Sequence, residues 1–286
     1  MMGGHHAASG AAAWVAVAST GPYTLGWYPL DPAGILIGGM ATAGTALVCD
    51  WDYRSSTVAQ SLPPLSNAIA LGIENASGGH RQGTHSILGA TAFVLLAAAV
   101  AQIQVDTPWG LLSLGAGLLC MFLINIAAKA LKLFPKSGFL TNWIFGLVMA
   151  GLVTVYAPEQ WTWLPMSMLI GVAVHIVGDL VTTGGVPLLW PLVIRPPRPL
   201  RRVPFLRSFW RPNGALSIPL LGRAGSKREW LLLIPVSAYA MVGLWMAGWS
   251  LAGGGWPALQ LYLSNFIGNF RHGAVIPGVG AGFRVF

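Results

Sequence analysis

Charged residues are scarce in this sequence. Of its 286 residues only 8% are Asp, Glu, Lys or Arg, whereas 55% are hydrophobic. An average soluble domain contains about 25% charged residues. A soluble chain of this length could not cover its surface with so few charges. The shortage therefore excludes an ordinary soluble protein and predicts an integral membrane protein.

Cysteine is also scarce. The two cysteines, Cys49 and Cys120, lie in or at the end of apolar segments, and no CxxC pair occurs. These numbers exclude a disulfide framework. The N-terminal stretch MMGGHHAASG lacks the basic region of a cleaved signal peptide, so we expect the first apolar segment to be retained.

Long apolar segments are what the sequence has in abundance. Several of them approach the ~20 residues needed to cross the hydrocarbon core, so we expect an all-α polytopic bundle of about seven transmembrane helices. The expected spans are approximately residues 7–20, 33–49, 86–105, 109–130, 140–156, 164–182 and 230–251. We also expect a short interfacial helix at 66–74 and an eighth short or interfacial helix within LQLYLSNFIGNF.

The basic residues predict the orientation of these spans. Nine of the sixteen Lys and Arg residues lie between Arg195 and Arg228. The excess of basic residues in cytoplasmic loops places this segment inside, and counting back places the N-terminus and the loop 50–85 inside as well. We interpret the basic segment as a topology anchor at an anionic leaflet, with substrate steering as an alternative. No recognition fold for specific nucleic-acid binding is apparent.

The rare ionisable residues fall at one depth of the expected bundle. They lie at the start of the first expected span, at the end of the second, at the start of the third and in the inner half of the sixth. The seven candidates for metal ligands are His6, Asp50, Asp52, His80, His85, His175 and Asp179. Imidazole and carboxylate together suit Zn²⁺, Mn²⁺ or Fe²⁺, and the set is large enough for one or two ions.

Each of these groups alone has a structural interpretation. The DWD run at 50–52 could cap a helix end, and HRQGTHS at 80–86 could be a polar interfacial loop. His175 and Asp179, four residues apart on one helix face, could be a pair that joins two helices. The convergence of four separate segments favours a metal site instead, because ionisable residues inside a membrane are usually functional.

These motifs together resemble the YdjM-like family. The matching residues are His6 with Gly10, the Asp50–Asp52 pair, the run 80–86, the His175–Asp179 pair and GVPLLWP at 185–191. The family usually has proline where this chain has Cys49, and glycine where it has Gln82. The family is described as inner-membrane, metal-dependent hydrolases and as LexA-binding. The resemblance therefore implies a hydrolase in a bacterial inner (plasma) membrane. The His and Asp set is also loosely similar to that of zinc-dependent phospholipase C and nuclease enzymes, which points to a phosphoester, including a lipid headgroup.

On this basis we expect a metal-activated water to attack an ester or phosphoester at the cytoplasmic face. The expected ligands are His6, Asp50, His85, His175 and Asp179. Asp52 and His80 are either further ligands or the partners that orient them, with a role in proton transfer. Arg81 is expected to hold a substrate oxyanion or phosphate. Thr84 and Ser86 would shape the turn.

Two other functions stay open from the sequence. A divalent-metal transporter or channel would carry polar residues near the membrane midplane on several helices. A non-catalytic membrane adaptor would not need this many ligand-type residues together. We expect a membrane-embedded hydrolase core at 1–191, a basic cytoplasmic loop at 192–229 and a C-terminal helix and tail at 230–286. Membrane lipids and a small-molecule or lipid substrate are the expected partners, and the oligomeric state is open.

Overall fold

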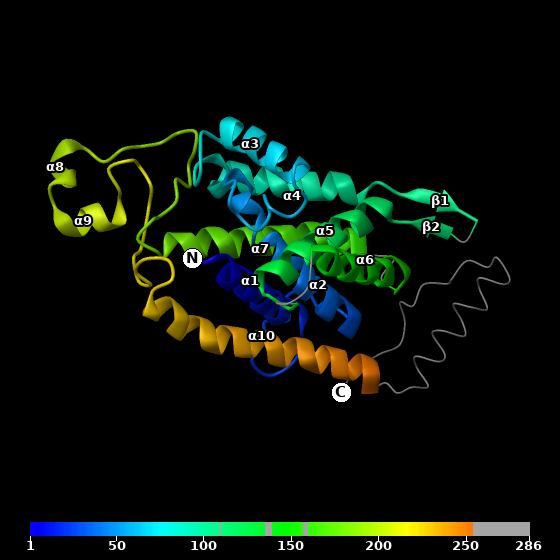
Figure 1. Ribbon diagram of the computed structural model, residues 1–286. Coiled ribbons are helices and arrows are strands. Elements are labelled where there is room, and N and C mark those ends of the chain that lie inside the picture. Colours follow the sequence, from blue (N-terminus) through cyan, green and yellow to red (C-terminus); the bar gives the residue numbers. More distant parts are fainter. Residues whose placement is uncertain (109, 135–138, 157–159, 254–286) are drawn as a thin grey trace.

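The computed structural model describes residues 1–108, 110–134, 139–156 and 160–253. This part of the chain is mostly helical (Figure 1). The α-helices are α1 (Gly3–Ala18), α2 (Pro32–Thr45), α3 (Leu65–Ser77), α4 (Ile87–Ala101), α5 (Leu114–Ala130), α6 (Phe139–Tyr156), α7 (Gln160–Leu180), α8 (Arg198–Arg201), α9 (Pro204–Phe209) and α10 (Lys227–Gly253). Two 3₁₀ helices, η1 (Val48–Asp52) and η2 (Gly83–His85), and two strands, β1 (Val105–Thr107) and β2 (Gly110–Leu112), complete the elements.

Local sequence signals set the starts of two of these helices. The Asp31 carboxylate accepts a hydrogen bond of 2.7 Å from the Gly34 amide, and Pro32 is the first residue of α2. The Ser86 hydroxyl accepts a bond of 3.1 Å from the Gly89 amide and caps α4 in the same way. Side-chain oxygens at this position satisfy amide groups that the helix cannot pair internally.

Small residues let the helices approach one another closely. Helix α1 packs against α2, α7 and α10, while α2 also contacts α5 and α7. A Cβ atom at Gly10 of α1 would lie 2.6 Å from the Thr42 carbonyl oxygen of α2, which is closer than real Cβ contacts. Glycine at this crossing is therefore needed for the spacing of α1 and α2, as in many membrane helix pairs.

Three of the described helices are long and apolar enough to cross a membrane: Pro32–Asp52, Thr162–Leu180 and Lys227–Ala252. Three shorter apolar helices occur at Ile87–Ala101, Leu114–Ala130 and Leu140–Leu152. Leu231, Met241 and Trp245 of α10 are 70–74% exposed, as expected for side chains that face lipid rather than a protein core. The fold is thus that of a helical membrane protein, and the count of about seven spans stays a prediction.

The boundaries of two expected spans were wrong. The segments 86–105 and 109–130 were predicted as continuous helices, but α4 ends at Ala101 and α5 begins at Leu114. Between them β1 and β2 form an antiparallel hairpin that pairs Asp106 with Leu111. Pro108 cannot continue a helix, and the β-branched Val105 and Thr107 suit a strand. The fold is therefore helical with one small two-stranded sheet, rather than strictly all-α.

Other expected elements lie close to their predicted positions. Helix α1 begins and ends a few residues before the expected span 7–20, and the predicted interfacial helix at 66–74 is α3. The short helix expected within LQLYLSNFIGNF lies outside the described residues.

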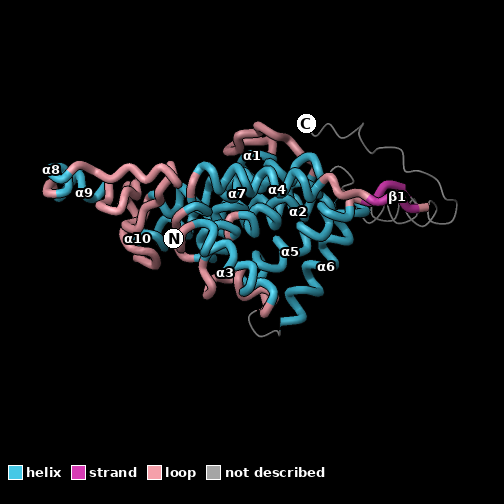
Figure 2. The backbone as a smooth tube through the Cα atoms, turned by 90° about the horizontal axis from the view of Figure 1, so that it is seen from above, coloured by secondary structure: helices cyan, strands magenta, loops and turns pink. Residues whose placement is uncertain are grey.

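The two ends of the helical bundle differ. The hairpin β1–β2 projects at one end, and the loop that carries α8 and α9 projects at the other (Figure 2). The N-terminus, the C-terminal end of α7 and the start of α10 all lie toward the second end (Figure 1). This arrangement brings segments far apart in the sequence to one end of the molecule.

Candidate metal centre

Four segments bring the seven predicted metal ligands together. Helix α1 supplies His6, η1 supplies two aspartates, the loop that ends in η2 supplies two histidines, and α7 supplies the pair His175 and Asp179. Their donor atoms form three overlapping groups, each compact enough to hold an ion. The groups are His6, His175 and Asp179; Asp50, His85 and His175; and Asp50, Asp52 and His80. The seven residues are therefore one connected cluster, and their roles as ligands stay predictions.

Two buried imidazoles face each other at the centre of the cluster. The Nε2 atoms of His85 and His175 lie 3.1 Å apart. The Nδ1 atom of His175 donates a 2.7 Å hydrogen bond to the carbonyl oxygen of Ala46, which leaves Nε2 with a lone pair. The Nδ1 atom of His85 lies 2.9 Å from the Thr84 hydroxyl. The contacts at Nδ1 thus orient both rings, and their Nε2 atoms face the same point.

Two carboxylates surround that point. Oδ1 of Asp50 lies 3.7 Å from Nε2 of His85 and 3.6 Å from Nε2 of His175. Oδ2 of Asp179 lies 3.6 Å and 3.9 Å from the same two nitrogens. A tetrahedral zinc ion with bonds of about 2.0–2.2 Å places its donor atoms about 3.3–3.6 Å apart. The observed spacings are close to this value.

Asp179 is a buried carboxylate that contributes negative charge to the same space. Its Oδ2 atom lies 3.0 Å from Nε of Arg81 and 3.6 Å from Nε2 of His85. Burying a carboxylate is costly unless cationic partners compensate for its charge. The donor set of two imidazoles and two carboxylates therefore suits a divalent ion such as Zn²⁺, Mn²⁺ or Fe²⁺.

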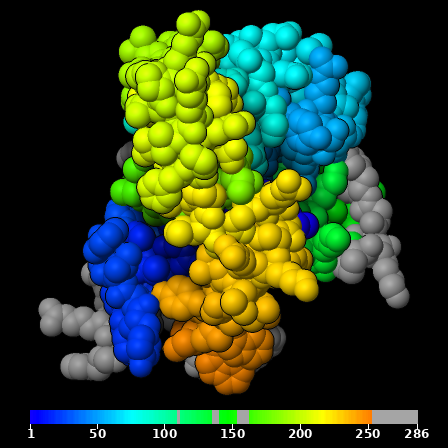
Figure 3. All heavy atoms as spheres, turned by 90° about the vertical axis from the view of Figure 1, so that its left-hand side faces the viewer, coloured from blue at the N-terminus to red at the C-terminus, as the bar shows by residue number. Residues whose placement is uncertain are grey.

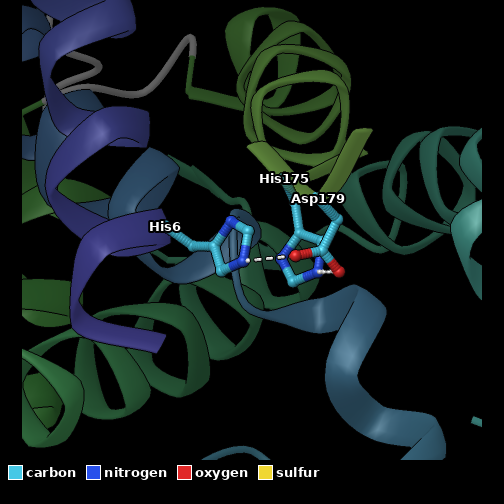
Figure 4. A group of neighbouring side chains, drawn as sticks. All are labelled: His6, His175 and Asp179. Atoms are coloured by element: carbon cyan, nitrogen blue, oxygen red, sulfur yellow. Dashed lines mark ion pairs between the residues drawn. The ribbon is translucent and has the colours of Figure 1, made fainter. Parts of the chain in front are cut away.

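His6 borders the centre from α1. Its Nε2 atom lies 3.4 Å from Oδ1 of Asp179, and its ring stacks on that of His175 with centroids 3.7 Å apart. Figure 4 shows His6 approaching from α1 toward the two α7 side chains. The α-amino group of Met1 also contacts Oδ1 of Asp179. His6 is thus close enough to be a ligand or to orient Asp179.

Asp52 organises the loop HRQGTHS. Its carboxylate accepts hydrogen bonds from Nδ1 of His80 at 2.8 Å, from the Arg81 amide at 3.0 Å and from the Thr84 hydroxyl. Arg81 has a φ angle of 58°, which is uncommon for a residue other than glycine. The contacts to Asp52 hold this conformation. These contacts orient the loop, while Asp52 also belongs to one of the three possible ligand groups, so both of its predicted roles stay predictions.

Arg81 links the cluster to a cavity. Its guanidinium pairs with Asp179, with Nε 3.0 Å from Oδ2 and Nη2 3.1 Å from Oδ1. The sequence did not predict this ion pair, because the two residues are 98 positions apart. The Arg81 side chain is 26% exposed and lines a cavity of about 280 Å³ together with Asp50, Tyr53 and His80. A molecule in this cavity would meet the guanidinium and one edge of the cluster.

The electrostatics of His85 reflect its carboxylate neighbours. This residue lies in η2, outside the apolar helices. Burial alone would lower the pKa of His85, but its contacts with Asp50 and Asp52 outweigh burial and raise the pKa to about 9. Without a metal, His85 therefore carries a proton on both nitrogens at neutral pH. The proton on Nε2 then lies between the two facing imidazoles.

A second polar contact at this end was not predicted. Nδ1 of His5 pairs with the buried carboxylate of Glu229, which also accepts hydrogen bonds from the Met2 amide at 2.9 Å and the Gly225 amide at 2.8 Å. These bonds join the start of α1 to the first turn of α10. An acidic residue in a first helical turn is common in any protein, so the sequence carried no specific signal for this pair.

Comparison with known proteins places the chain in a family. No match was found among curated proteins or among solved structures. A family model described as "YdjM inner membrane protein" matches residues 1–128 and 138–250. The match includes all seven residues of the cluster and extends beyond the motifs that end at Pro191. The chain therefore belongs to the YdjM inner membrane protein family.

Proposed function

We propose that the protein is a metal-dependent hydrolase of the bacterial inner membrane. The observation that carries this proposal is the 3.1 Å approach of the Nε2 atoms of His85 and His175, with carboxylate oxygens of Asp50 and Asp179 3.6–3.9 Å from them. In the proposal these four residues hold one divalent ion, with zinc as the first candidate. His6 is a further ligand or supports a second ion.

When bound by these residues, a divalent ion would supply a nucleophile at neutral pH, because such ions lower the pKa of water from about 15.7 toward 7. The other residues of the site have separate tasks in the proposal. Asp52 fixes His80 through Nδ1, which leaves Nε2 of that ring to take up or deliver a proton. Arg81 orients Asp179 and places charged N–H donors at the cavity wall. Such donors suit the oxygens of a phosphate or a developing oxyanion.

The proposed substrate is an ester or phosphoester at the cytoplasmic face, including a lipid headgroup. Polar groups line much of the cavity, namely Asp50, His80, Arg81 and the hydroxyl residues 55–57. The start of α1, which carries His6, and the C-terminal end of α7, which carries His175 and Asp179, lie toward the end of the bundle where the strongly basic loop projects (Figure 1). The excess of basic residues in that loop is the reason to place the site on the cytoplasmic side.

The test uses the full-length protein in lipid nanodiscs, loaded in turn with zinc, manganese and iron. The panel contains phosphomonoesters, phosphodiesters and carboxyl esters, each as a water-soluble compound and as a lipid. We expect hydrolysis of at least one class, with loss of both activity and bound metal in His85→Ala and His175→Ala. Asp106→Asn changes a carboxylate in the exposed hairpin and is the matched control, which should retain both.

Arg81→Gln separates binding of the substrate from binding of the metal. We expect this variant to keep its metal while KM rises and kcat falls, because the guanidinium pairs with Asp179 and lines the cavity but is not itself a metal ligand. Unchanged hydrolysis in both histidine variants would contradict the proposal. Uptake of metal into proteoliposomes with no hydrolysis of any compound would favour a transporter instead.

A further inference from the structure

The segment that joins α7 to α10 has a composition unlike the rest of the chain. Residues 192–223, here called the basic lobe, contain seven arginines and no aspartate or glutamate. The lobe includes the short helices α8 and α9. It projects from the end of the bundle that faces the viewer in Figure 3, in yellow-green and yellow. Its charge is therefore concentrated on one projection of the molecule.

The basic lobe also exposes large apolar side chains between its arginines. Leu192 is 74% exposed, Phe205 is 69% exposed and Ile194 is 59% exposed. The ring of Phe205 packs at a tilted angle against that of Phe209 in the same helix, with ring centroids 4.8 Å apart. A surface that exposes contiguous apolar side chains generally contacts another apolar surface. Arginines interleaved with such side chains are typical of segments that lie in the headgroup region of a membrane.

An apolar cavity lies at the base of the lobe. It has a volume of about 220 Å³, and no charged residue contributes to its lining. Leu188, Trp190, Leu192, Ile194, Trp210 and Leu216 form most of its wall. Leu192 belongs both to this wall and to the exposed apolar surface. The cavity is therefore open to the same surroundings as the exposed side chains.

We propose that the basic lobe binds anionic phospholipids of the leaflet at which α7 ends and α10 begins. The arginines bind the lipid phosphates, because the planar guanidinium group binds two phosphate oxygens at once. Phe205 and Ile194 enter the upper acyl region, and the cavity beside Leu192 receives part of one acyl chain. This binding site does not depend on hydrolysis, and it is separate from the cluster at His85 and His175.

The connections of the lobe favour a lipid surface over a soluble partner. The lobe is tied at both ends to helices that are long and apolar enough to cross a membrane, Thr162–Leu180 and Lys227–Ala252. Its reach is therefore limited to the neighbourhood of the leaflet. A basic charge combined with apolar side chains binds anionic membranes more firmly than either feature alone.

The experiment measures where the lobe lies in a bilayer. The full-length protein, with Cys49 and Cys120 replaced by alanine, carries an environment-sensitive dye at Phe205→Cys or Leu192→Cys. It is reconstituted in nanodiscs of phosphatidylcholine alone or of phosphatidylcholine with phosphatidylglycerol. In the anionic discs we expect blue-shifted dye emission, with quenching at Phe205→Cys by lipids spin-labelled near the headgroup and at Leu192→Cys by lipids spin-labelled on the acyl chain.

Charge variants distinguish the contribution of the arginines to lipid binding from that of the other residues of the lobe. Replacement of Arg198, Arg201, Arg202 and Arg207 by glutamine should abolish the difference between the two kinds of disc. Replacement of the same four arginines by lysine keeps the charge and should retain most of the difference between the two kinds of disc. Water-like emission in both discs, or emission that is equal in both, would overturn the proposal. This comparison of the two discs needs no arginine variant, so a variant that fails to fold does not affect it.

Discussion

Metal binding should weaken about 100-fold when the pH falls from about 8 to about 6, because His85 must lose a proton to bind a metal. The pKa of His85 in the metal-free protein is about 9. Below that value the deprotonated fraction, and with it the metal affinity, falls about tenfold for each pH unit. The affinity should therefore rise with pH and level off above about 9. A histidine with the ordinary pKa of about 6.5 would give only about a fourfold change over the same interval.

The measurement is a titration of the metal-stripped protein with zinc in nanodiscs, in competition with a chelating indicator. Calorimetry in two buffers with different ionisation enthalpies gives the number of protons released, which we expect to be about one near neutral pH. Asp52→Asn removes one of the carboxylates that raise the pKa of His85, so the variant should show a shallower pH dependence. A fourfold change in the unmodified protein, with no proton release, would refute the reasoning.

Further predictions concern the fold around the site. Gly10→Ala should lower the free energy of unfolding by about 1–3 kcal/mol in chemical denaturation, because the added Cβ would overlap the Thr42 carbonyl. A Cβ at Gly151 would meet open space, so the control Gly151→Ala should not lower the free energy of unfolding. Glu229→Ala should cost about 1–3 kcal/mol in the same assay by leaving buried groups at His5 and Met2 without an acceptor, and an unchanged denaturation midpoint would contradict this. Asp52→Ala should weaken metal affinity about 10–100-fold, as replacing the partner of a ligand usually does, and full affinity would show that Asp52 does not position His85.

The sequence alone predicted the location of the cluster because ionisable residues are so rare in this chain. His175 and Asp179 had to share a helix face, and the basic loop placed the ends of the neighbouring spans on one side. Simple counting of spans then brought Asp50, His85 and His6 to the same depth. Scarcity of charge, rather than any single motif, made this prediction possible.

The finer arrangement of the site could not be predicted from the sequence. The ion pair of Arg81 with Asp179 and the three hydrogen bonds of Asp52 depend on the path of the loop, where Arg81 adopts a left-handed conformation. Sequence patterns do not specify such a path. The hairpin at 105–112 was missed for a related reason. Apolar composition alone does not distinguish a short strand from the end of a helix.

The most direct test of the central claim is the position of a bound metal. Crystals of the zinc-loaded protein, measured at the absorption edge of zinc, locate the ion by anomalous scattering. We expect a peak between the Nε2 atoms of His85 and His175, within about 2.0–2.2 Å of both nitrogens and of carboxylate oxygens of Asp50 and Asp179. Saturating zinc with no peak there, or a peak only elsewhere in the molecule, would contradict it.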